Sequence, residues 1–293
     1  MSQTVKSEGS TAVLAKTSMF GHRPVLRPHT DSQREHGGTY DRRRTRQLLL
    51  RALAGIGSII GLWSAIVAIF DVQPWVMPSP LPTLQTLIDE RSTIWSHSVV
   101  TVAGSFAGLA FSTVFAVSLA MLFVSSPTTQ RALLPVAIVL RSIPIVAVAP
   151  LITLFAGRGL RTSIICVTVV SFFPLLVYTA KGFRSTTSEM RELMRVSGAS
   201  RLQVFRFASF PTALPFLFAG LRSASAVAVL GALLAEWLTG VQGLGTLLTM
   251  AAALRDTELL WAVVIVATLL SLIIFWTMQA LERAVLAWSR GER

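Results

Sequence analysis

Long apolar segments constrain this chain more than any other feature of its sequence. They lie near residues 48–70, 99–124, 133–155, 164–180, 219–238 and 259–281. Each comes close to or exceeds the roughly 20 apolar residues that a helix needs to cross a bilayer. Hydrophobic residues make up 53% of the chain and charged residues 14%. A soluble domain of this composition would expose more apolar surface than water tolerates. The sequence therefore predicts an all-α integral membrane protein with about six transmembrane helices.

The distribution of basic residues predicts the orientation of these helices. If the N-terminus is inside, the cytoplasmic segments hold 20 Lys and Arg residues and the outer segments hold four, Arg91, Arg158, Arg161 and Arg255. Basic residues are retained on the cytoplasmic side of a membrane. We therefore expect both termini to lie inside. The same distribution accounts for the net charge of +12, so that charge does not require a nucleic-acid partner.

The N-terminal segment differs in composition from the rest of the chain. Residues 1–45 are rich in Ser, Thr, Gly, His and Arg and lack apolar periodicity, which predicts a disordered, basic cytoplasmic tail before a membrane domain at 46–293. The segment is not a secretory signal, because the first apolar run begins near Leu48 and is too long. Arg42–Arg44 resemble a twin-arginine signal faintly, but an orientation anchor is the preferred interpretation. A nucleic-acid-binding tail would need aromatic residues or a fold motif, which are absent.

One charged segment, residues 184–218, separates the fourth and fifth predicted spans. Thr186 and Glu189 form a T-x-x-E capping box, which predicts a helix from about Thr187 to Ser197. Glu192 and Arg195 stand one turn apart on this helix and are expected to pair.

A second short helix is predicted in the same segment. Gly198 can adopt the positive φ that ends a helix. Ser200 and Gln203 form another capping box, and Pro211 is expected to close the helix that it opens. The segment therefore predicts a helix, a sharp turn and a helix in water.

The spacing of Glu192, Gly198 and Phe210-Pro211 resembles the EAA loop, E-A-A-x3-G-x9-I-x-L-P, of the membrane subunits of bacterial ABC importers. Leu193 and Met194 replace the two alanines of that pattern, and Ala208 and Phe210 replace its isoleucine and leucine. The surrounding LMRVSGASRLQVFRFASFPTALPFLFAGLR is similar to the nitrate, sulfonate and taurine permease branch. The resemblance covers about residues 48–285.

The resemblance implies a permease of the bacterial inner membrane whose cytoplasmic loop docks in a groove of an ABC ATPase subunit. It also implies a second membrane subunit, expected to be an identical copy, and an external solute-binding protein. ATP and Mg would be bound by the ATPase, and this chain would need no cofactor. The alternative is a basic amphipathic loop lying on the membrane. The residues assigned to the coupling loop are Glu189, Glu192, Leu193, Met194, Gly198, Ala199, Ser200 and Pro211.

The substrate implied by the resemblance is a small solute, with a preference for an anion such as a sulfonate, taurine or nitrate. A pyrimidine precursor of thiamine or another small organic solute is the alternative. Specificity in this family resides largely in the binding protein.

Three residues near the membrane are candidates for the substrate pathway or its gate: Arg141, Pro144 and Glu236. Buried ionisable groups in a bilayer are functional candidates by default. Arg141, like Arg222, either extends to lipid phosphates or faces a central cavity. Pro144, with Pro150, predicts a kink that either lines a polar pathway or only bends the third span. Glu236, in AEWLTGVQGLG, is interpreted as structural support for the following loop, with an outer gate or a binding-protein contact as the alternatives.

Other parts of the spans predict packing or surface structure. Thr101, Gly104, Gly108 and Ser112 form one row of small residues, and Gly220, Ala224, Ala228 and Ala232 form another. Such rows let helices approach closely in lipid. The proline-rich segment 74–82 is expected to be non-helical at the outer surface, followed by a short helix at 83–95. A helix at 246–254 would cover the outer mouth.

Residue patterns for catalysis are missing from the sequence. The chain has no G-x-x-x-x-G-K-[ST], and its lysines are Lys6, Lys16 and Lys181, so it has no recognisable ATP site. Three of its four histidines fall in the tail and the fourth, His97, falls at a predicted membrane boundary. The single cysteine, Cys166, lies in an apolar span, which argues against a metal cluster. An intramembrane enzyme is therefore disfavoured, and an exporter is disfavoured by the coupling loop in a chain with no fused ATPase.

Overall fold

The computed structural model describes residues 37–287, with side chains from Leu50 onward except at positions 52 and 53. All regular structure in this part of the chain is helical. The helices are α1 (Gly37–Ile69), α2 (Pro80–Asp89), α3 (Arg91–Ser125), α4 (Pro127–Ser142), α5 (Ile145–Ala156), α6 (Leu160–Arg184), α7 (Ser188–Val196), α8 (Arg201–Val204), the π-helical turn η1 (Phe205–Ser209), α9 (Phe210–Thr239), α10 (Leu244–Leu254) and α11 (Thr257–Val285).

The chain divides near Gly57 into two units, of which the second, residues 58–293, contains most of the structure. In the first unit, α1 begins at Gly37 and therefore within the segment predicted as a tail. The remainder of the predicted tail lies outside the described residues, as do the side chains of Arg42–Arg44. The second unit contains the rest of α1 and the helices from α2 to α11.

Among the described residues, four stretches of helix are long and apolar enough to cross a membrane: α3, α6, the continuous segment from α8 to α9, and α11. The pair α4 and α5 would make a fifth span, although the two helices are bent by 98° at their junction. In the described part of α1, the apolar stretch Ala54–Ile69 is shorter than these spans. The predicted all-α membrane architecture is thus confirmed, whereas the count of six spans and their orientation stay predictions.

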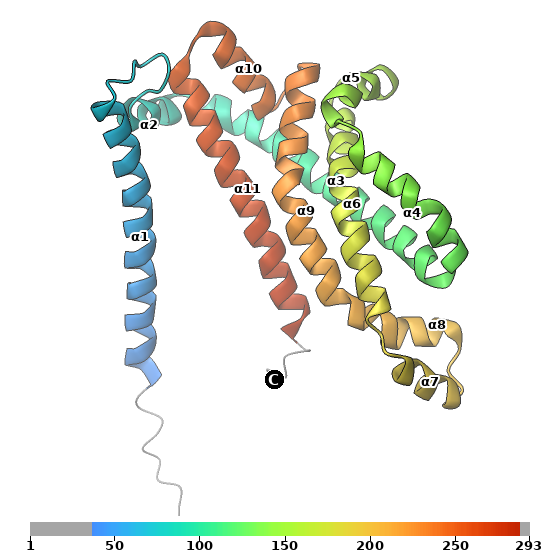
Figure 1. The fold of residues 1–293 in the computed structure, drawn as a ribbon. Helices are drawn as coiled ribbons and strands as arrows, with labels where there is room; N and C mark the ends of the chain where they lie inside the picture. Colours follow the sequence, from blue (N-terminus) through green and yellow to red (C-terminus); the bar gives the residue numbers. More distant parts are fainter. Residues whose placement is uncertain (1–36, 288–293) are drawn as a thin grey trace, which may run out of the picture. The chain divides into compact units, whose positions relative to one another are not determined.

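The centre of the unit is formed by α6, which packs against both α3 and α9 (Figure 1). The two rows of small residues lie at these contacts, as predicted. A side chain at Gly104 would reach Ser163 Oγ at 2.6 Å, and one at Gly220 would approach Tyr178 Cβ at 3.0 Å. Ala224, Ala228 and Ala232 are fully buried. Because lipid tails are as apolar as the side chains, this close approach, rather than exclusion from water, stabilises the three-helix contact.

The third predicted span is broken at Pro144, one of the two prolines that were expected to kink it. Residues Ile143 and Pro144 have extended backbone between α4 and α5, and Pro144 caps the N-terminus of α5. Pro150, by contrast, lies inside α5, which continues through it. The prediction of a kink is therefore confirmed at Pro144, but Pro150 does not interrupt its helix.

The proline-rich segment 74–82 is helical over its last three residues, which corrects the prediction that it is not. Pro80 begins α2 and Pro82 lies in its first turn, where the missing N–H group of proline costs no helical hydrogen bond. The helix expected at 83–95 is interrupted at Glu90, after which α3 begins at Arg91. The second span therefore starts earlier than the apolar pattern alone indicated.

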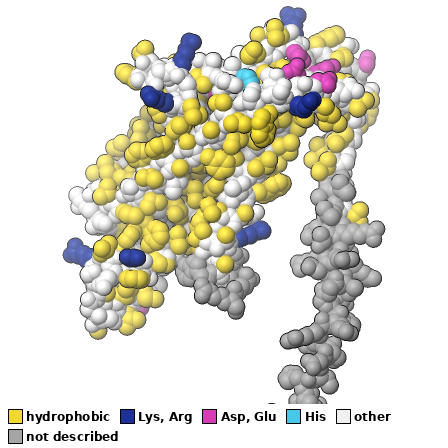
Figure 2. All heavy atoms as spheres, turned by 180° about the vertical axis from the view of Figure 1, so that it is seen from behind, with side chains coloured by type: hydrophobic (Ala, Val, Ile, Leu, Met, Phe, Trp, Pro, Cys, Tyr) yellow, Lys and Arg dark blue, Asp and Glu magenta, His cyan; other side chains and the backbone are white. Residues whose placement is uncertain are grey.

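The two ends of the unit differ in what they carry. The loop with α7 and α8 lies at one end, and α2, α10 and the start of α11 lie at the other (Figure 1). On the face shown in Figure 2, hydrophobic side chains cover the middle, while Lys and Arg side chains gather toward the two ends. This is the distribution expected of helices that cross a hydrocarbon layer.

Candidate functional site

The loop between α6 and α9 begins with a well-capped helix. Thr187 caps the N-terminus of α7, and its hydroxyl accepts a hydrogen bond from the backbone N–H of Met190 at 3.3 Å. The cap therefore lies one residue later than the predicted Thr186, whose side chain is buried with no hydrogen-bond partner. The capping box predicted with Glu189 is not formed, because the cap at Thr187 places Met190 at the third helical position.

Gly198 ends α7 in the conformation that the sequence predicted. Its φ is +78°, in the left-handed region, and its N–H donates to Arg195 O at 2.9 Å. The N–H of Ala199 donates to Met194 O at 2.9 Å, which completes a Schellman motif. These bonds satisfy carbonyls of the last turn and reverse the chain direction within two residues.

The second half of the loop confirms one prediction and corrects another. Ser200 and Gln203 form the predicted capping box, with both reciprocal hydrogen bonds present. Pro211, however, does not close α8. The chain passes from α8 through the π-helical turn η1 into α9, where the N–H of Phe210 donates to Phe205 O. The wider turn accommodates Pro211, which has no N–H group, at the second position of α9.

Three of the four charged side chains of α7, those of Glu189, Glu192 and Arg195, are exposed, and that of Arg191 is half-buried. The predicted ion pair between Glu192 and Arg195 is not present among the described residues. Glu189 accepts hydrogen bonds from its own backbone N–H and from the hydroxyls of Thr187 and Ser188, and these lower the pKa of its carboxyl. Glu189 is therefore charged at neutral pH at the helix N-terminus, where a negative charge is stabilising.

The same helix exposes apolar side chains that nothing in the described chain covers. Met190 is 49% exposed, Leu193 64% and Val196 89%, and they stand at every third position of the helix. Beyond the turn, Leu202 is also exposed. A helix whose ends are capped and whose apolar side chains face outward has the form of a ligand for a groove in another protein.

At the opposite end of the unit, Glu236 is the centre of a buried polar cluster. Its Oε2 accepts hydrogen bonds from Thr101 Oγ1 at 3.0 Å and from the backbone N–H of Gly245 at 2.9 Å. Its Oε1 has no hydrogen-bond partner among the described residues, and the whole residue is fully buried. Thr101 Oγ1 also accepts from the N–H of Leu244 at 2.9 Å. Glu236 and Thr101 thus hold the first turn of α10, at Leu244 and Gly245.

The glycines of that turn leave room for the carboxyl. A side chain at Gly243 would overlap the carboxyl of Glu236, and one at Gly245 would overlap Leu233 O. His97 Nδ1 lies 2.7 Å from Gly243 O and 3.2 Å from Gly243 N, so either of its tautomers has a partner on this glycine. The cluster therefore joins α3, α9 and α10 through one turn.

The remaining pathway candidates lie elsewhere and do not converge with Glu236. Arg141, at the end of α4, places its guanidinium 4.8 Å from the ring centre of Phe173. Arg222 Nε lies 3.1 Å from Glu282 Oε2, which joins α9 to α11. This ion pair was not among the interpretations drawn for Arg222 from the sequence. Pro144 is exposed at the junction of α4 and α5.

Comparison with known proteins identifies the family. Residues 108–287 match the family described as the binding-protein-dependent transport system inner membrane component, and this region covers α6, the loop, α9 and Glu236, but not Thr101 and His97. The chain belongs to this family. It is a multi-pass protein of the inner membrane.

Relatives of this permease are membrane subunits of several transport systems. The permease is 32% identical to the riboflavin transport system permease protein RibX of Chloroflexus aurantiacus over 78% of its own length and 87% of that protein. It is 31% identical to the formylaminopyrimidine transport permease protein ThiX of Halalkalibacterium halodurans, over 75% of its own length and 88% of that protein. It is 24% identical to the taurine transport system permease protein TauC of Escherichia coli, over 83% of its own length and 91% of that protein.

A solved structure shares the fold of the permease. The match is to an inward-facing conformation of the MetNI methionine ABC transporter, with a TM-score of 0.60, 20% sequence identity, and coverage of 67% of this chain and 98% of that one. At this identity the match supports the architecture of the helices only.

Sequence reasoning located the loop but missed the partners of Glu236. Thr101 was assigned to a packing row and His97 to a membrane boundary, yet both contact the Gly243–Gly245 turn. The only signal available was the run AEW…GLG, because two glycines so close to a buried carboxylate indicate a turn folded back upon it.

Proposed function

We propose that the permease is the membrane-spanning subunit of an ATP-driven importer, in which α7 docks into a separate cytoplasmic ATPase subunit. The observation that carries this proposal is the exposed apolar row of Met190, Leu193 and Val196 on a helix that is capped at both ends. Water disfavours such a row, and a hydrophobic groove on a partner would remove it from solvent.

The orientation of the chain follows from the same proposal. If α7 faces the cytoplasm, both termini are inside, and this agrees with the count of 20 cytoplasmic against four outer basic residues. The α10 end then faces outward, where a solute-binding protein would deliver its cargo. A second, identical permease subunit would complete the pathway, and two ATPase subunits would each receive one loop.

The geometry of the loop suits it to transmit movement. Through η1, α8 continues into α9, and α7 follows α6 after three residues, so both helices that meet at the centre of the unit are attached directly to the docking segment. Movement of α7 by a closing ATPase would therefore reach the contact between α6 and α9. That contact is closely packed and is expected to shift as a unit between inward-facing and outward-facing states.

Glu236 has a structural role in this proposal. Its fully buried carboxyl holds the first turn of α10 against α3, so it fixes part of the outer surface rather than binding solute in this conformation. Arg141 and Pro144 line the region where α4 meets α5 and are proposed as parts of the pathway wall.

For the substrate, we propose a small heteroaromatic solute related to riboflavin or to a formylated pyrimidine. Support comes from the identities of 32% and 31% to permeases named for these solutes, against 24% to the taurine permease. A sulfonate such as taurine is the second candidate, which the weaker similarity and the exposed Arg158 and Arg161 support.

The proposal can be tested by purifying the tagged permease in mild detergent from its native host and identifying the co-purified proteins by mass spectrometry. We expect an ATPase with a G-x-x-x-x-G-K-[ST] loop. The same cells, with and without the permease gene, would then be compared for uptake of labelled riboflavin, a formylaminopyrimidine and taurine.

Recovery of the folded permease without any ATPase would contradict the importer assignment. Loss of taurine uptake alone on gene deletion would leave that assignment intact and replace the heteroaromatic substrate with the sulfonate.

A further inference from the structure

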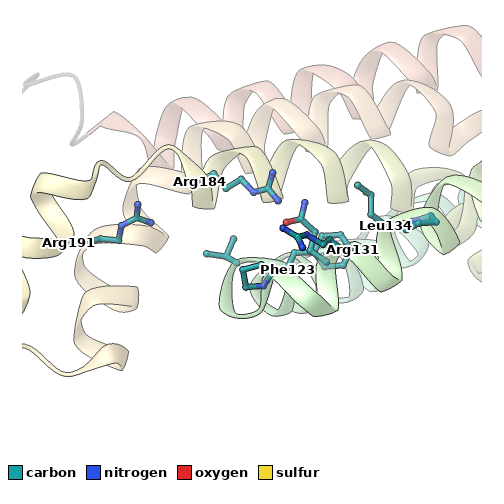
Figure 3. Close-up of a pocket in the computed structure, with 9 residues that line it drawn as sticks. Phe123, Arg131, Leu134, Arg184 and Arg191 are labelled. Atoms are coloured by element: carbon teal, nitrogen blue, oxygen red, sulfur yellow. The ribbon is translucent and has the colours of Figure 1, made fainter.

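The loop between α6 and α9, which carries the proposed docking helix α7, is called the docking loop below. A cavity of about 560 Å³ lies beside it, where four helices approach one another. It is lined by the end of α3, the first turns of α4, the last residue of α6 and the middle of α7, and it shares no residue with the Glu236 cluster. Arg131, Arg184 and Arg191 contribute charge to it, and Phe123, Leu134 and Pro135 contribute apolar wall (Figure 3).

The three arginines are brought to the cavity from separate helices. Arg131 comes from α4, Arg184 is the last residue of α6, and Arg191 lies on α7. In Figure 3 the side chain of Arg184 extends from its helix toward Arg131, with Arg191 on the side of the docking loop. No carboxylate lines the cavity, and none of the three arginines forms an ion pair with the acidic side chains that the structure describes. The cavity therefore concentrates positive charge without an internal counter-ion.

The chemistry of these side chains selects the class of ligand. Guanidinium groups present planar, paired N–H donors that match phosphate oxygens, and they stay charged at any physiological pH. A cavity with three such groups and no acidic residue is suited to a phosphate-bearing anion.

The position of the cavity indicates the source of that phosphate. It lies where α3 ends at Ser125 and α6 ends at Arg184, and both helices are long and apolar enough to cross a membrane, so we expect the cavity near the level at which these spans leave the hydrocarbon layer. One wall continues along α4, whose Val136, Val139 and Leu140 are 52%, 62% and 47% exposed. A lipid whose headgroup enters the cavity could lay an acyl chain over this apolar surface, whereas a soluble phosphate would leave it uncovered.

We propose that this cavity binds the phosphate headgroup of an anionic phospholipid, held by Arg131 and Arg184 with Arg191 on the loop side. Basic pockets between membrane helices are known to accept anionic headgroups. Because Arg191 belongs to α7, an occupied site links the bilayer to the docking helix. The inference does not depend on which solute the permease carries.

Native mass spectrometry of the purified permease, with the subunits that accompany it, would test the proposal. The complex is exchanged into detergent containing equal amounts of phosphatidylglycerol and phosphatidylcholine, and the retained lipids are counted. We expect the wild type to retain phosphatidylglycerol preferentially. In Arg131→Gln/Arg184→Gln this preference should fall roughly thirty-fold, the equivalent of two basic side chains at about 1 kcal/mol each.

Two further variants serve as controls. Arg158→Gln/Arg161→Gln removes two exposed arginines near the start of α6, at its other end, and should keep the preference. Arg131→Lys/Arg184→Lys keeps both charges but removes the paired donors, so its preference should lie between those of the wild type and the glutamine variant.

Specific outcomes would overturn the proposal. An unchanged preference in Arg131→Gln/Arg184→Gln, or an equal loss in the Arg158 and Arg161 variant, would show that the cavity does not select the headgroup. Loss of the ATPase with the lipid preference intact would assign the cavity to the subunit interface. If inorganic phosphate raises the melting temperature of the delipidated wild type but not of the glutamine variant, and no lipid preference is found, the ligand is a soluble phosphate instead.

Discussion

The backbone N–H of Gly245 donates a hydrogen bond to Oε2 of Glu236 at 2.9 Å, and this bond ties the first turn of α10 to the last turns of α9. The same oxygen accepts from Thr101 Oγ1 on α3. One buried carboxyl therefore connects α9 and α10, which are consecutive in the sequence, with the distant α3, at the end of the unit opposite the docking loop.

Replacing Glu236 with alanine is expected to lower the free energy of unfolding by about 1–3 kcal/mol, because two buried donors lose their acceptor. Glu236→Gln keeps one oxygen acceptor and should lie between this variant and the wild type. The measurement is the thermal unfolding of the purified complex in detergent. Glu258→Ala is the matched control, since Glu258 is exposed and accepts a single hydrogen bond, from Thr86. Equal destabilisation by Glu258→Ala and Glu236→Ala would show that the buried cluster has no special role.

Replacing Gly198 with valine is expected to abolish co-purification of the ATPase while the permease still inserts in the membrane. A β-branched residue at φ +78° is strained by about 1–2 kcal/mol or more, although no atom lies within 4 Å of the position of its Cβ. The cost is therefore one of backbone conformation, and it falls on the turn between α7 and α8. Gly198→Asn should be tolerated better, because asparagine enters the left-handed region more readily.

The control for this prediction is Gly61→Val in α1, where the glycine also has open space but lies within a helix without a positive φ. Recovery of the ATPase with Gly198→Val at the wild-type level would refute the role of the turn in docking.

Gly108→Ala is expected to destabilise the permease by about 1–3 kcal/mol, through overpacking between α3 and α6. The added methyl group would overlap the Cβ and Cγ1 atoms of Val167 and lie 3.0 Å from Ile164 O. Gly104→Ala should cost less, because its closest obstacle is the hydroxyl of Ser163, which can rotate. Thermal unfolding of both variants checks the order. Greater destabilisation by Gly104→Ala than by Gly108→Ala would contradict the prediction, because it would mean that α3 and α6 can move apart at Gly108 to make room for the methyl group.

The ion pair between Arg222 and Glu282 is expected to contribute about 1 kcal/mol of coupling between α9 and α11. The estimate is modest because the Arg222 side chain is about one-third exposed, so solvent screens the attraction. Thermal unfolding of Arg222→Ala, Glu282→Ala and the double variant forms a double-mutant cycle that measures this coupling free energy directly. Strictly additive effects of the two substitutions would show that the contact has no energetic role.

The docking loop was the part of the candidate site that the sequence predicted best. Gly198 and the pair Ser200 and Gln203 act through atoms within a few residues of one another, so local sequence specifies their geometry. The wrong prediction at Pro211 shows the limit of such local rules. Proline removes one hydrogen bond in any context, but whether a helix stops there or widens into a π-turn depends on what the continuing helix packs against.

The apolar runs of this chain determined that it is a helical membrane protein, because a bilayer requires long hydrophobic helices whatever their arrangement. The glycine and capping residues of the docking loop determined its turn. Tertiary structure alone decided which residues surround Glu236, that Arg222 pairs with Glu282, and that Arg131, Arg184 and Arg191 share one cavity. These contacts join helices far apart in the sequence, and the register and tilt at which helices pack depend on all of their side chains together.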